Sequence, residues 1–200
     1  MKRYLVLLLL TISSAASAQL AESAFHVNWS IMVPTYTEYV GNTSTHGFRV
    51  GFTRFMNERF GFGIDGAYNA LDDYVSRQTY TYPGGAITTD IFNYMYYYTL
   101  TASGKYFFAT DGLLAPYAAL GAGVSYTEYT QYFNAYSDQE TKTAFVARPE
   151  AGTYFRFNKY SGFGLKASVA FDYTTNQTDY LELKNFSGLS FQVGIVLFNN

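Results

Sequence analysis

Apolar and polar side chains alternate with a period of two along most of the chain, and this constrains its fold more than any other feature. Such a period is typical of β-strands, because successive side chains of a strand point to opposite faces of its sheet. Eight segments show it, within residues 25–34, 47–53, 60–69, 94–108, 118–127, 144–157, 163–173 and 189–197. After the N-terminal region no stretch approaches the roughly 18 consecutive apolar residues of a membrane-spanning helix. The sequence therefore predicts an all-β fold.

Residues 1–18 are predicted to be a signal peptide. Met1-Lys2-Arg3 is a basic start, Leu5 to Ile12 is apolar, and Ala16-Ser17-Ala18 resembles a cleavage site before Gln19. The alternative is a retained anchor helix, but the apolar run is far shorter than the roughly 20 residues that a spanning helix needs. Residues 19–200 are then expected to form one domain in an exported protein.

Composition narrows the class of protein further. Without Lys2 and Arg3 the chain has 11 basic and 15 acidic side chains, so it has no basic footprint for nucleic acid. It has no cysteine, and its two histidines are 20 positions apart, so we expect no disulfide, metal site or cofactor. Aromatic residues make up 20% of the chain and charged residues only 14%. Two architectures remain: a soluble β-protein of lipocalin type, or a β-barrel that spans a membrane.

The connections between the alternating segments differ in length. Those at 56–59, 109–112 and 158–161 are short and contain turn-forming residues, whereas those at 35–45, 72–86, 130–140 and 174–185 are long and polar. An even number of strands, with short turns at one end and long loops at the other, is typical of outer-membrane barrels. We predict an eight-stranded antiparallel up-and-down transmembrane β-barrel, with short periplasmic turns and longer extracellular loops.

The bulky apolar rows of these segments are assigned to lipid. An eight-stranded barrel has an interior just wide enough for side chains, and rows of Phe, Tyr, Leu and Ile from every strand would overfill it. The opposite rows are rich in Gly, Ala, Ser and Thr and include charges of both signs, which favours a polar network that plugs the lumen. Its predicted members are His26, Arg49, Asp65, Lys105, Arg148, Glu150, Lys166 and Asp172. Pro149 falls inside a strand, where we expect a bulge or a locally broken ladder.

Several stretches resemble the small OmpA/OmpX-like outer-membrane β-barrel family. They are Ser30–Thr35 (SIMVPT), Gly47–Arg59, Ala115–Gly123 (APYAALGAG), Ala147–Gly152 (ARPEAG) and Gly194–Phe198 (GIVLF). The resemblance implies a place in the outer membrane of a Gram-negative bacterium, in contact with its lipid. It also implies insertion by an assembly machinery that recognises a C-terminal strand ending in an aromatic residue, although here Asn199 and Asn200 follow Phe198. The family's roles include adhesion, envelope resistance and structural support.

The long loops suggest a structural or surface-interaction role. They combine tyrosines with Thr, Asn, Ser and Gln, a composition that suits adaptable binding loops because a tyrosine offers a large contact area at a small entropy cost. Loops that are merely solvated, or aromatic extensions of the sheet, are the alternative. The tyrosines predicted to bind an unidentified surface ligand are Tyr36, Tyr39, Tyr74, Tyr80, Tyr82, Tyr132, Tyr136 and Tyr180.

Two other functions are weighed. A lipid-modifying enzyme would need a polar group of residues at the rim, and only His46, with Ser44 and Asp72 or Asp73, offers one, so we expect no enzymatic activity. An OmpW-like conduit for small hydrophobic molecules would need a mostly apolar lumen, whereas the inward rows predicted here are polar.

Overall fold

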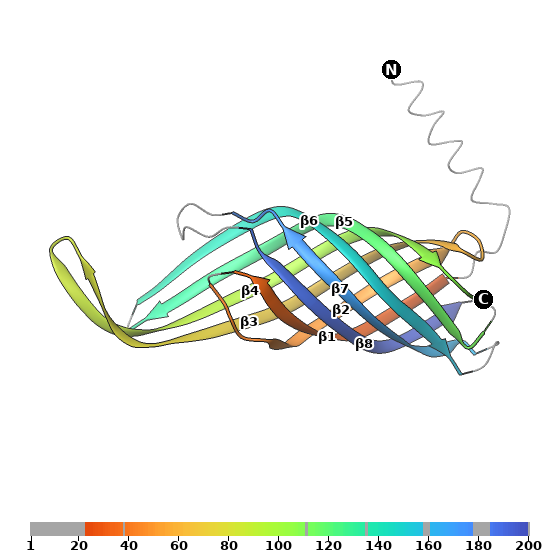
Figure 1. Cartoon of the computed structure of the whole chain (residues 1–200), viewed down its shortest axis with the longest axis horizontal. Helices are drawn as coiled ribbons and strands as arrows, with labels where there is room; N and C mark the ends of the chain where they lie inside the picture. Colours follow the sequence, from red (N-terminus) through yellow and green to blue (C-terminus); the bar gives the residue numbers. More distant parts are fainter. Residues whose placement is uncertain are drawn as a thin grey trace, which may run out of the picture.

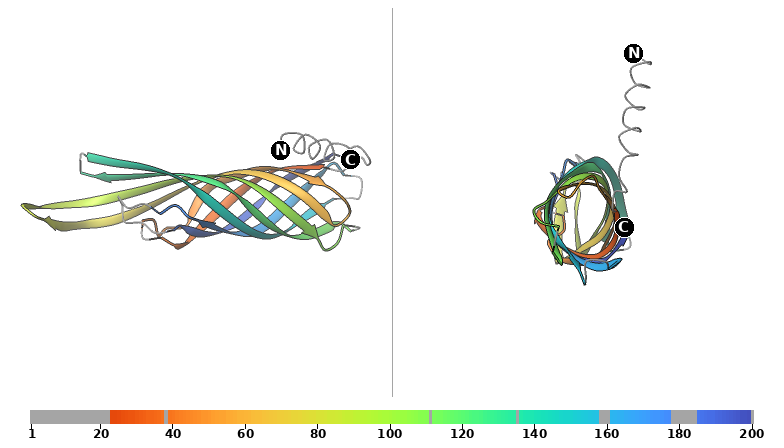
Figure 2. Two further views of the ribbon diagram at one scale, coloured as in Figure 1. Left: turned by 90° about the horizontal axis from the view of Figure 1, so that it is seen from above. Right: turned by 90° about the vertical axis from the view of Figure 1, so that its right-hand side faces the viewer.

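The computed structural model describes residues 23–37, 39–110, 112–134, 136–157, 161–177 and 185–199, and these form eight antiparallel strands. The strands are β1 (Ser23–Tyr36), β2 (Ser44–Phe55), β3 (Phe60–Tyr82), β4 (Gly85–Phe107), β5 (Leu114–Phe133), β6 (Tyr136–Arg156), β7 (Phe163–Thr174) and β8 (Ser187–Asn199). Each pairs with its neighbours in sequence, and β1 pairs with β8 to close the barrel (Figures 1 and 2). The predicted fold is confirmed, while the predicted signal peptide lies outside the described residues.

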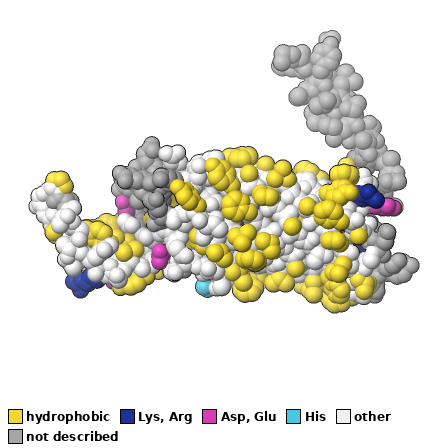
Figure 3. All heavy atoms as spheres, viewed as in Figure 1, with side chains coloured by type: hydrophobic (Ala, Val, Ile, Leu, Met, Phe, Trp, Pro, Cys, Tyr) yellow, Lys and Arg dark blue, Asp and Glu magenta, His cyan; other side chains and the backbone are white. Residues whose placement is uncertain are grey.

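The period of two in the sequence becomes an outward and an inward row on every strand. β7 alternates strictly between exposed and buried residues over its whole length. Figure 3 shows the outward rows as a band of hydrophobic side chains across the visible face of the barrel, with charged side chains near its two ends. In the part of the chain that the structure describes, no helix is long and apolar enough to cross a membrane.

The two ends of the barrel differ. Short turns join the strands at the end where β8 finishes, next to the start of β1, which is the periplasmic end (Figure 1). In the turn between β2 and β3, Asn57 Oδ1 accepts hydrogen bonds from the backbone N–H groups of Arg59 and Phe60, at 2.9 and 2.8 Å. A side chain that bonds to backbone two or three residues on is the turn chemistry that the sequence indicated.

At the extracellular end, two segments expected to be loops are strands instead. β3 and β4 stay paired from Phe60↔Tyr106 to Tyr82↔Gly85, so residues 72–86 form a hairpin that projects beyond the barrel (Figure 1). The turn at its tip requires a positive φ, and Gly84 has a φ of 103°. β5 and β6 likewise stay paired out to Phe133↔Tyr136. Alternating Tyr, Thr and Ile side chains favour strand pairing even where no lipid lies beside it.

Pro149 breaks a ladder without inserting a bulge. Between β6 and β7 the pairs run from Ala147↔Tyr173 directly to Glu150↔Ala170, a gap of three residues on both strands and therefore no register shift. Because proline has no N–H group, it cannot donate to the neighbouring strand. Its other neighbour, β5, keeps the register through Leu120↔Pro149.

Candidate functional site

The buried side chains inside the barrel form three layers along its axis. A polar and ionic layer lies in the middle. An aromatic cluster at the periplasmic end comprises Ala24, Phe107, Tyr117, Tyr154, Val196 and Phe198. A second cluster at the outer mouth comprises Met32, Tyr39, Val40, Leu71, Met95, Tyr97, Tyr129 and Phe186.

Arg148 on β6 is the centre of one half of the middle layer. Its Nη1 donates to both carboxylate oxygens of Asp172, at 2.6 and 2.8 Å, and its Nη2 donates to Ser190 Oγ at 3.2 Å. Its Nε lies 3.4 Å from Glu150 Oε2. Glu150 also accepts from Lys166 Nζ at 3.1 Å and from the hydroxyl of Tyr117 at 2.5 Å. A buried network of this kind is favourable only while each charge keeps its partners.

His26 joins the two halves of this layer. Its Nε2 lies 2.9 Å from Asp65 Oδ1 and 3.2 Å from Lys166 Nζ. Gly51 makes room for this contact, because a Cβ atom at position 51 would lie 2.3 Å from Asp65 Oδ1 and 2.6 Å from His26 Nε2. The small inward residues of β2 therefore allow the larger polar side chains of β1 and β3 to meet.

The remaining two predicted network members are also buried in this layer. Lys105 Nζ donates to Thr53 Oγ1 at 2.8 Å and lies 5.6 Å from the centroid of the Tyr117 ring. Arg49 is only 1% exposed, and its Nε and Nη1 atoms have no hydrogen-bond partner among the described residues. The structure thus brings all eight predicted residues into one layer, seven of them through direct polar contacts with other side chains.

The periplasmic cluster is one that sequence reasoning missed. Tyr117 and Tyr154 stack at 5.2 Å between ring centroids, and Phe198 meets Tyr154 edge-on. The guanidinium of Arg156 lies 4.1 Å above the Phe198 ring. Gly152 leaves space for these rings, since a Cβ atom there would lie 2.8 Å from the Tyr117 hydroxyl. Phe198 could have indicated this cluster, because the alternation of β8 places it on the inward face and not in the lipid-facing row.

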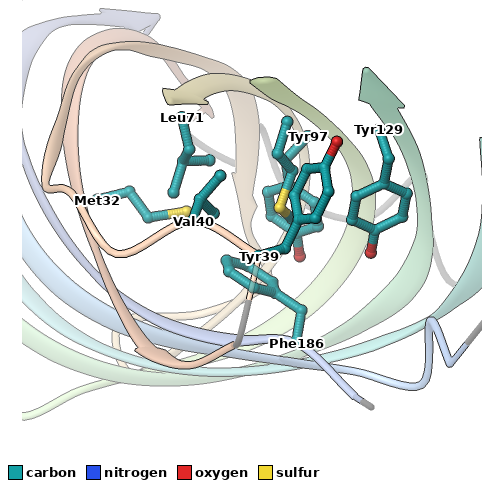
Figure 4. Close-up of a cluster of buried hydrophobic side chains, with 8 residues drawn as sticks. Met32, Tyr39, Val40, Leu71, Tyr97, Tyr129 and Phe186 are labelled. Atoms are coloured by element: carbon teal, nitrogen blue, oxygen red, sulfur yellow. The ribbon is translucent and has the colours of Figure 1, made fainter. Parts of the chain in front are cut away.

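At the outer mouth, the connection between β1 and β2 folds into the lumen (Figure 4). Tyr39 packs edge-on against Tyr129, with 5.2 Å between the ring centroids, and its carbonyl accepts from Asn93 Nδ2 at 3.0 Å. Asp73 holds the same connection by accepting from the backbone N–H of Gly41 at 3.1 Å. Burial raises the pKa of the Tyr39 phenol above its usual range. Tyr39 is therefore part of a plug and is not available to a surface ligand, which corrects its prediction as a recognition residue.

These layers correct one expectation about the lumen. Its inward rows were expected to be polar and small throughout, but buried aromatic rings occupy both ends, and the buried charges lie in the middle. At the ends, inward glycines on neighbouring strands compensate for the bulk of the rings.

Above the barrel, the outer face of the projecting sheet carries a row of aromatic side chains. Tyr74, Phe92 and Tyr132 are direct cross-strand neighbours on β3, β4 and β5, and they are 53%, 43% and 47% exposed. The Tyr74 and Phe92 ring centroids are 4.8 Å apart. We call these three residues the aromatic row. Phe92 was missed by sequence reasoning, although it continues the alternation of the neighbouring tyrosines.

The other predicted loop tyrosines are dispersed. Tyr36 ends β1 and is exposed, Tyr136 begins β6 and is exposed, and Tyr80 is half-buried on β3. Tyr82 is the last residue of β3, and Tyr180 lies outside the described residues.

The rim residues considered for catalysis do not converge on His46. The Ser44 hydroxyl donates to the Ala70 carbonyl and accepts from the backbone N–H of His46. Asp73 accepts from Gly41 N and from Asn42 Nδ2. Within the described ranges, no group of three or more His, Cys, Asp or Glu side chains is placed to hold a metal ion.

Comparisons with known proteins agree with this architecture. A search of curated proteins gives no match. Ail, the attachment invasion locus protein of Yersinia pestis, solved with the heparin analogue sucrose octasulfate, has a TM-score of 0.53 at 14% identity, over 90% of this chain and all of Ail. Neisserial surface protein A has a TM-score of 0.53 at 16% identity, over 88% of this chain and 95% of the neisserial chain. The outer membrane protein OprG of Pseudomonas aeruginosa has a TM-score of 0.53 at 13% identity, over 90% of this chain and 96% of OprG.

These identities support the fold alone. The family model described as "Outer membrane protein beta-barrel domain" matches residues 4–197, nearly the whole sequence. The outward apolar band is therefore in contact with outer-membrane lipid. The chain belongs to the outer membrane protein β-barrel domain family.

Proposed function

We propose that this protein is a surface-interaction protein of the outer membrane, which binds another macromolecule through the sheet that projects from its barrel. The observation that carries the proposal is the aromatic row of Tyr74, Phe92 and Tyr132. Three exposed rings side by side form an apolar patch of the kind that protein interaction sites use, and tyrosine in particular is enriched there. The barrel then serves as a rigid anchor for this sheet.

Strand length places the row outside the membrane. A tilted strand needs roughly 9–11 residues to cross, so the 23 residues of β4 exceed a span by about 12. Tyr106 lies near the periplasmic end of β4, where it pairs with Phe60. Counting about 11 residues from Tyr106 ends the span near Tyr96. Phe92 lies four residues further along the strand, so the row is exposed on the cell-surface side.

Recognition by side chains fits this sheet better than pairing of a partner's strand with its edge. Beyond Ala70, β3 has no strand on its β2 side among the described residues. That edge is interrupted by a register shift between Val75 and Gln78, and the exposed Arg77 lies within the shift. Bulges and charges are features that protect an edge from strand addition.

Charge narrows the class of partner. The projecting sheet contains Asp72, Asp73, Asp90, Glu128, Asp138 and Glu140 but only two basic residues, Arg77 and Lys142. A polyanion would be repelled by this excess of carboxylates. The heparin analogue bound by Ail is therefore a poor model for the ligand here, and we propose a partner surface that is uncharged or basic.

Adhesion of whole cells tests the proposal. Cells that display the wild-type protein should bind beads coated with a basic protein more than beads coated with heparin. Replacing the aromatic row by serine (Tyr74→Ser, Phe92→Ser, Tyr132→Ser) should abolish the difference while the amount of heat-modifiable barrel in the outer membrane stays unchanged. Replacing the exposed Tyr36→Ser, at the other side of the mouth, is the matched control. Equal adhesion by the triple variant would refute the proposal.

The filling of the lumen is evidence on the alternative function, a conduit for small hydrophobic molecules. Buried side chains occupy the lumen in three layers, which favours a plugged barrel over a conduit for small hydrophobic molecules. Recognition by the outer-membrane assembly machinery stays a prediction of the family resemblance. In the folded barrel, the ring of Phe198 is buried against Tyr154.

A further inference from the structure

The middle layer of the lumen has an excess of positive charge. Among the described residues, its buried ionic side chains are four cations and three carboxylates: Arg49, Lys105, Arg148 and Lys166 against Asp65, Glu150 and Asp172. With His26 neutral, one positive charge is left without a counter-charge. An uncompensated charge in a medium of low dielectric constant is costly, so such charges are generally paired.

Two of the cations, Arg49 and Lys105, have no carboxylate oxygen within 4.0 Å among the described residues. Asp172 pairs with Arg148, and Glu150 pairs with Lys166 and Arg148, while Asp65 bonds to the neutral His26. Lys105 donates to the hydroxyls of Thr53 and Tyr154, so Arg49 is the cation whose donors are left unsatisfied. Its Nε and Nη1 atoms are buried and have no hydrogen-bond partner in the described part of the chain. A guanidinium has five N–H donors and no acceptor, so it needs acceptors to be satisfied.

The neighbours of Arg49 across the strands are uncharged and short. Its inward neighbours are Asn28 on β1 and Ala67 on β3, and Thr99 on β4 lies beyond Ala67. Nδ2 and Oδ1 of Asn28 and Oγ1 of Thr99 are also buried without a hydrogen-bond partner among the described residues. Adjacent strands are about 4.8 Å apart, so Arg49 and Thr99 are separated by roughly 10 Å across a residue no larger than alanine.

We propose that the lumen holds one small monovalent anion of the size of chloride, bound over Ala67 between Arg49 and Thr99. Arg49 would donate through Nε or Nη1, Thr99 through its hydroxyl, and Asn28 through its amide. Water could satisfy the same donors, but it could not neutralise the excess charge. The anion would be a structural component of the barrel, independent of any ligand on the cell surface.

Anion-dependent stability tests this site in solution. The folded protein in a neutral detergent is unfolded with urea at one ionic strength, in sodium chloride or in sodium gluconate, whose anion is much larger than chloride. Chloride should lower the wild-type unfolding constant by a factor of 1 + [Cl⁻]/Kd, about 100-fold at 100 times Kd. Thr99→Val removes one donor and keeps the charge, so it should reduce this factor, and Arg49→Gln should remove it.

Lys142→Gln, a cation on the projecting sheet, is the control for general salt effects and should keep the wild-type factor. If Arg49→Gln does not fold, the comparison of Thr99→Val with the wild type is the test of the site. The proposal is overturned if chloride lowers the unfolding constant of Thr99→Val by the same factor as that of the wild type. It is also overturned if chloride leaves the unfolding constant of the wild type unchanged. In crystals grown with sodium bromide, the anomalous signal of a bound ion should lie within hydrogen-bonding distance of Arg49. Water at that position, with no anomalous signal, would equally overturn it.

Discussion

Replacing Glu150 by glutamine should strongly destabilise the barrel. Glu150 accepts from Lys166 at 3.1 Å, from Tyr117 at 2.5 Å and from Arg148 at 3.4 Å, and Lys166 is fully buried. Glutamine keeps the shape of the side chain, so no cavity is formed. Its amide group, however, carries no charge and brings two donors into a site already surrounded by donors. The excess positive charge of the middle layer would rise from one to two.

The size of the effect follows from this burial. Removing one partner of a buried ion pair costs about 3–5 kcal/mol, because the other charge is left uncompensated. At about 1.4 kcal/mol for each factor of ten, Glu150→Gln should raise the unfolding constant by between about 140-fold and about 3,700-fold. Glu140 and Lys142 form a pair at 3.4 Å in which Lys142 is 38% exposed. Lys142→Gln should therefore cost only about 0–1 kcal/mol.

Urea unfolding in lipid vesicles measures both variants. Trp29 is the only tryptophan and lies on the outward face of β1, so its emission reports the transfer from lipid to water. The double variant Glu150→Gln, Lys166→Met removes the stranded charge and should regain much of the loss. If Glu150→Gln costs no more than Lys142→Gln, the middle layer is solvated and the reasoning from buried charge is wrong.

Three further outcomes are expected. Gly51→Ala should lower stability by about 1–3 kcal/mol in urea unfolding, because its Cβ atom would clash with Asp65 and His26, whereas Gly104→Ala, with no atom within 4 Å of its Cβ, should be neutral or slightly stabilising. Leu100→Arg, on the lipid face of β4, should cost about 2–4 kcal/mol and reduce the heat-modifiable fraction on a gel; an unchanged fraction would contradict the assigned membrane face. The wild-type protein should show no discrete conductance steps in planar bilayers, and reproducible openings would contradict the plugged lumen.

The sequence alone was sufficient for the fold. Strict alternation, as in β7, identifies strands and assigns every side chain to one of two faces, because the side-chain period of a strand is two. Once the bulky row is assigned to lipid, the charged residues of the opposite row must share the interior. The sequence therefore predicted that residues as distant as His26 and Lys166 lie in one layer, although period and parity gave no information on which of them make contact.

Only the tertiary structure decided how far the strands extend and where the rings lie. The alternation is weak in residues 72–86, and the pairing of β3 with β4 continues there because two strands stabilise each other through cross-strand neighbours that a linear pattern does not reveal. Tyr39 is in a polar segment that suits a surface loop, yet it is buried, because the outer mouth offers an apolar space lined by residues distant in sequence. Which neighbours a side chain meets across a closed barrel depends on register, and register is a property of the assembled strands.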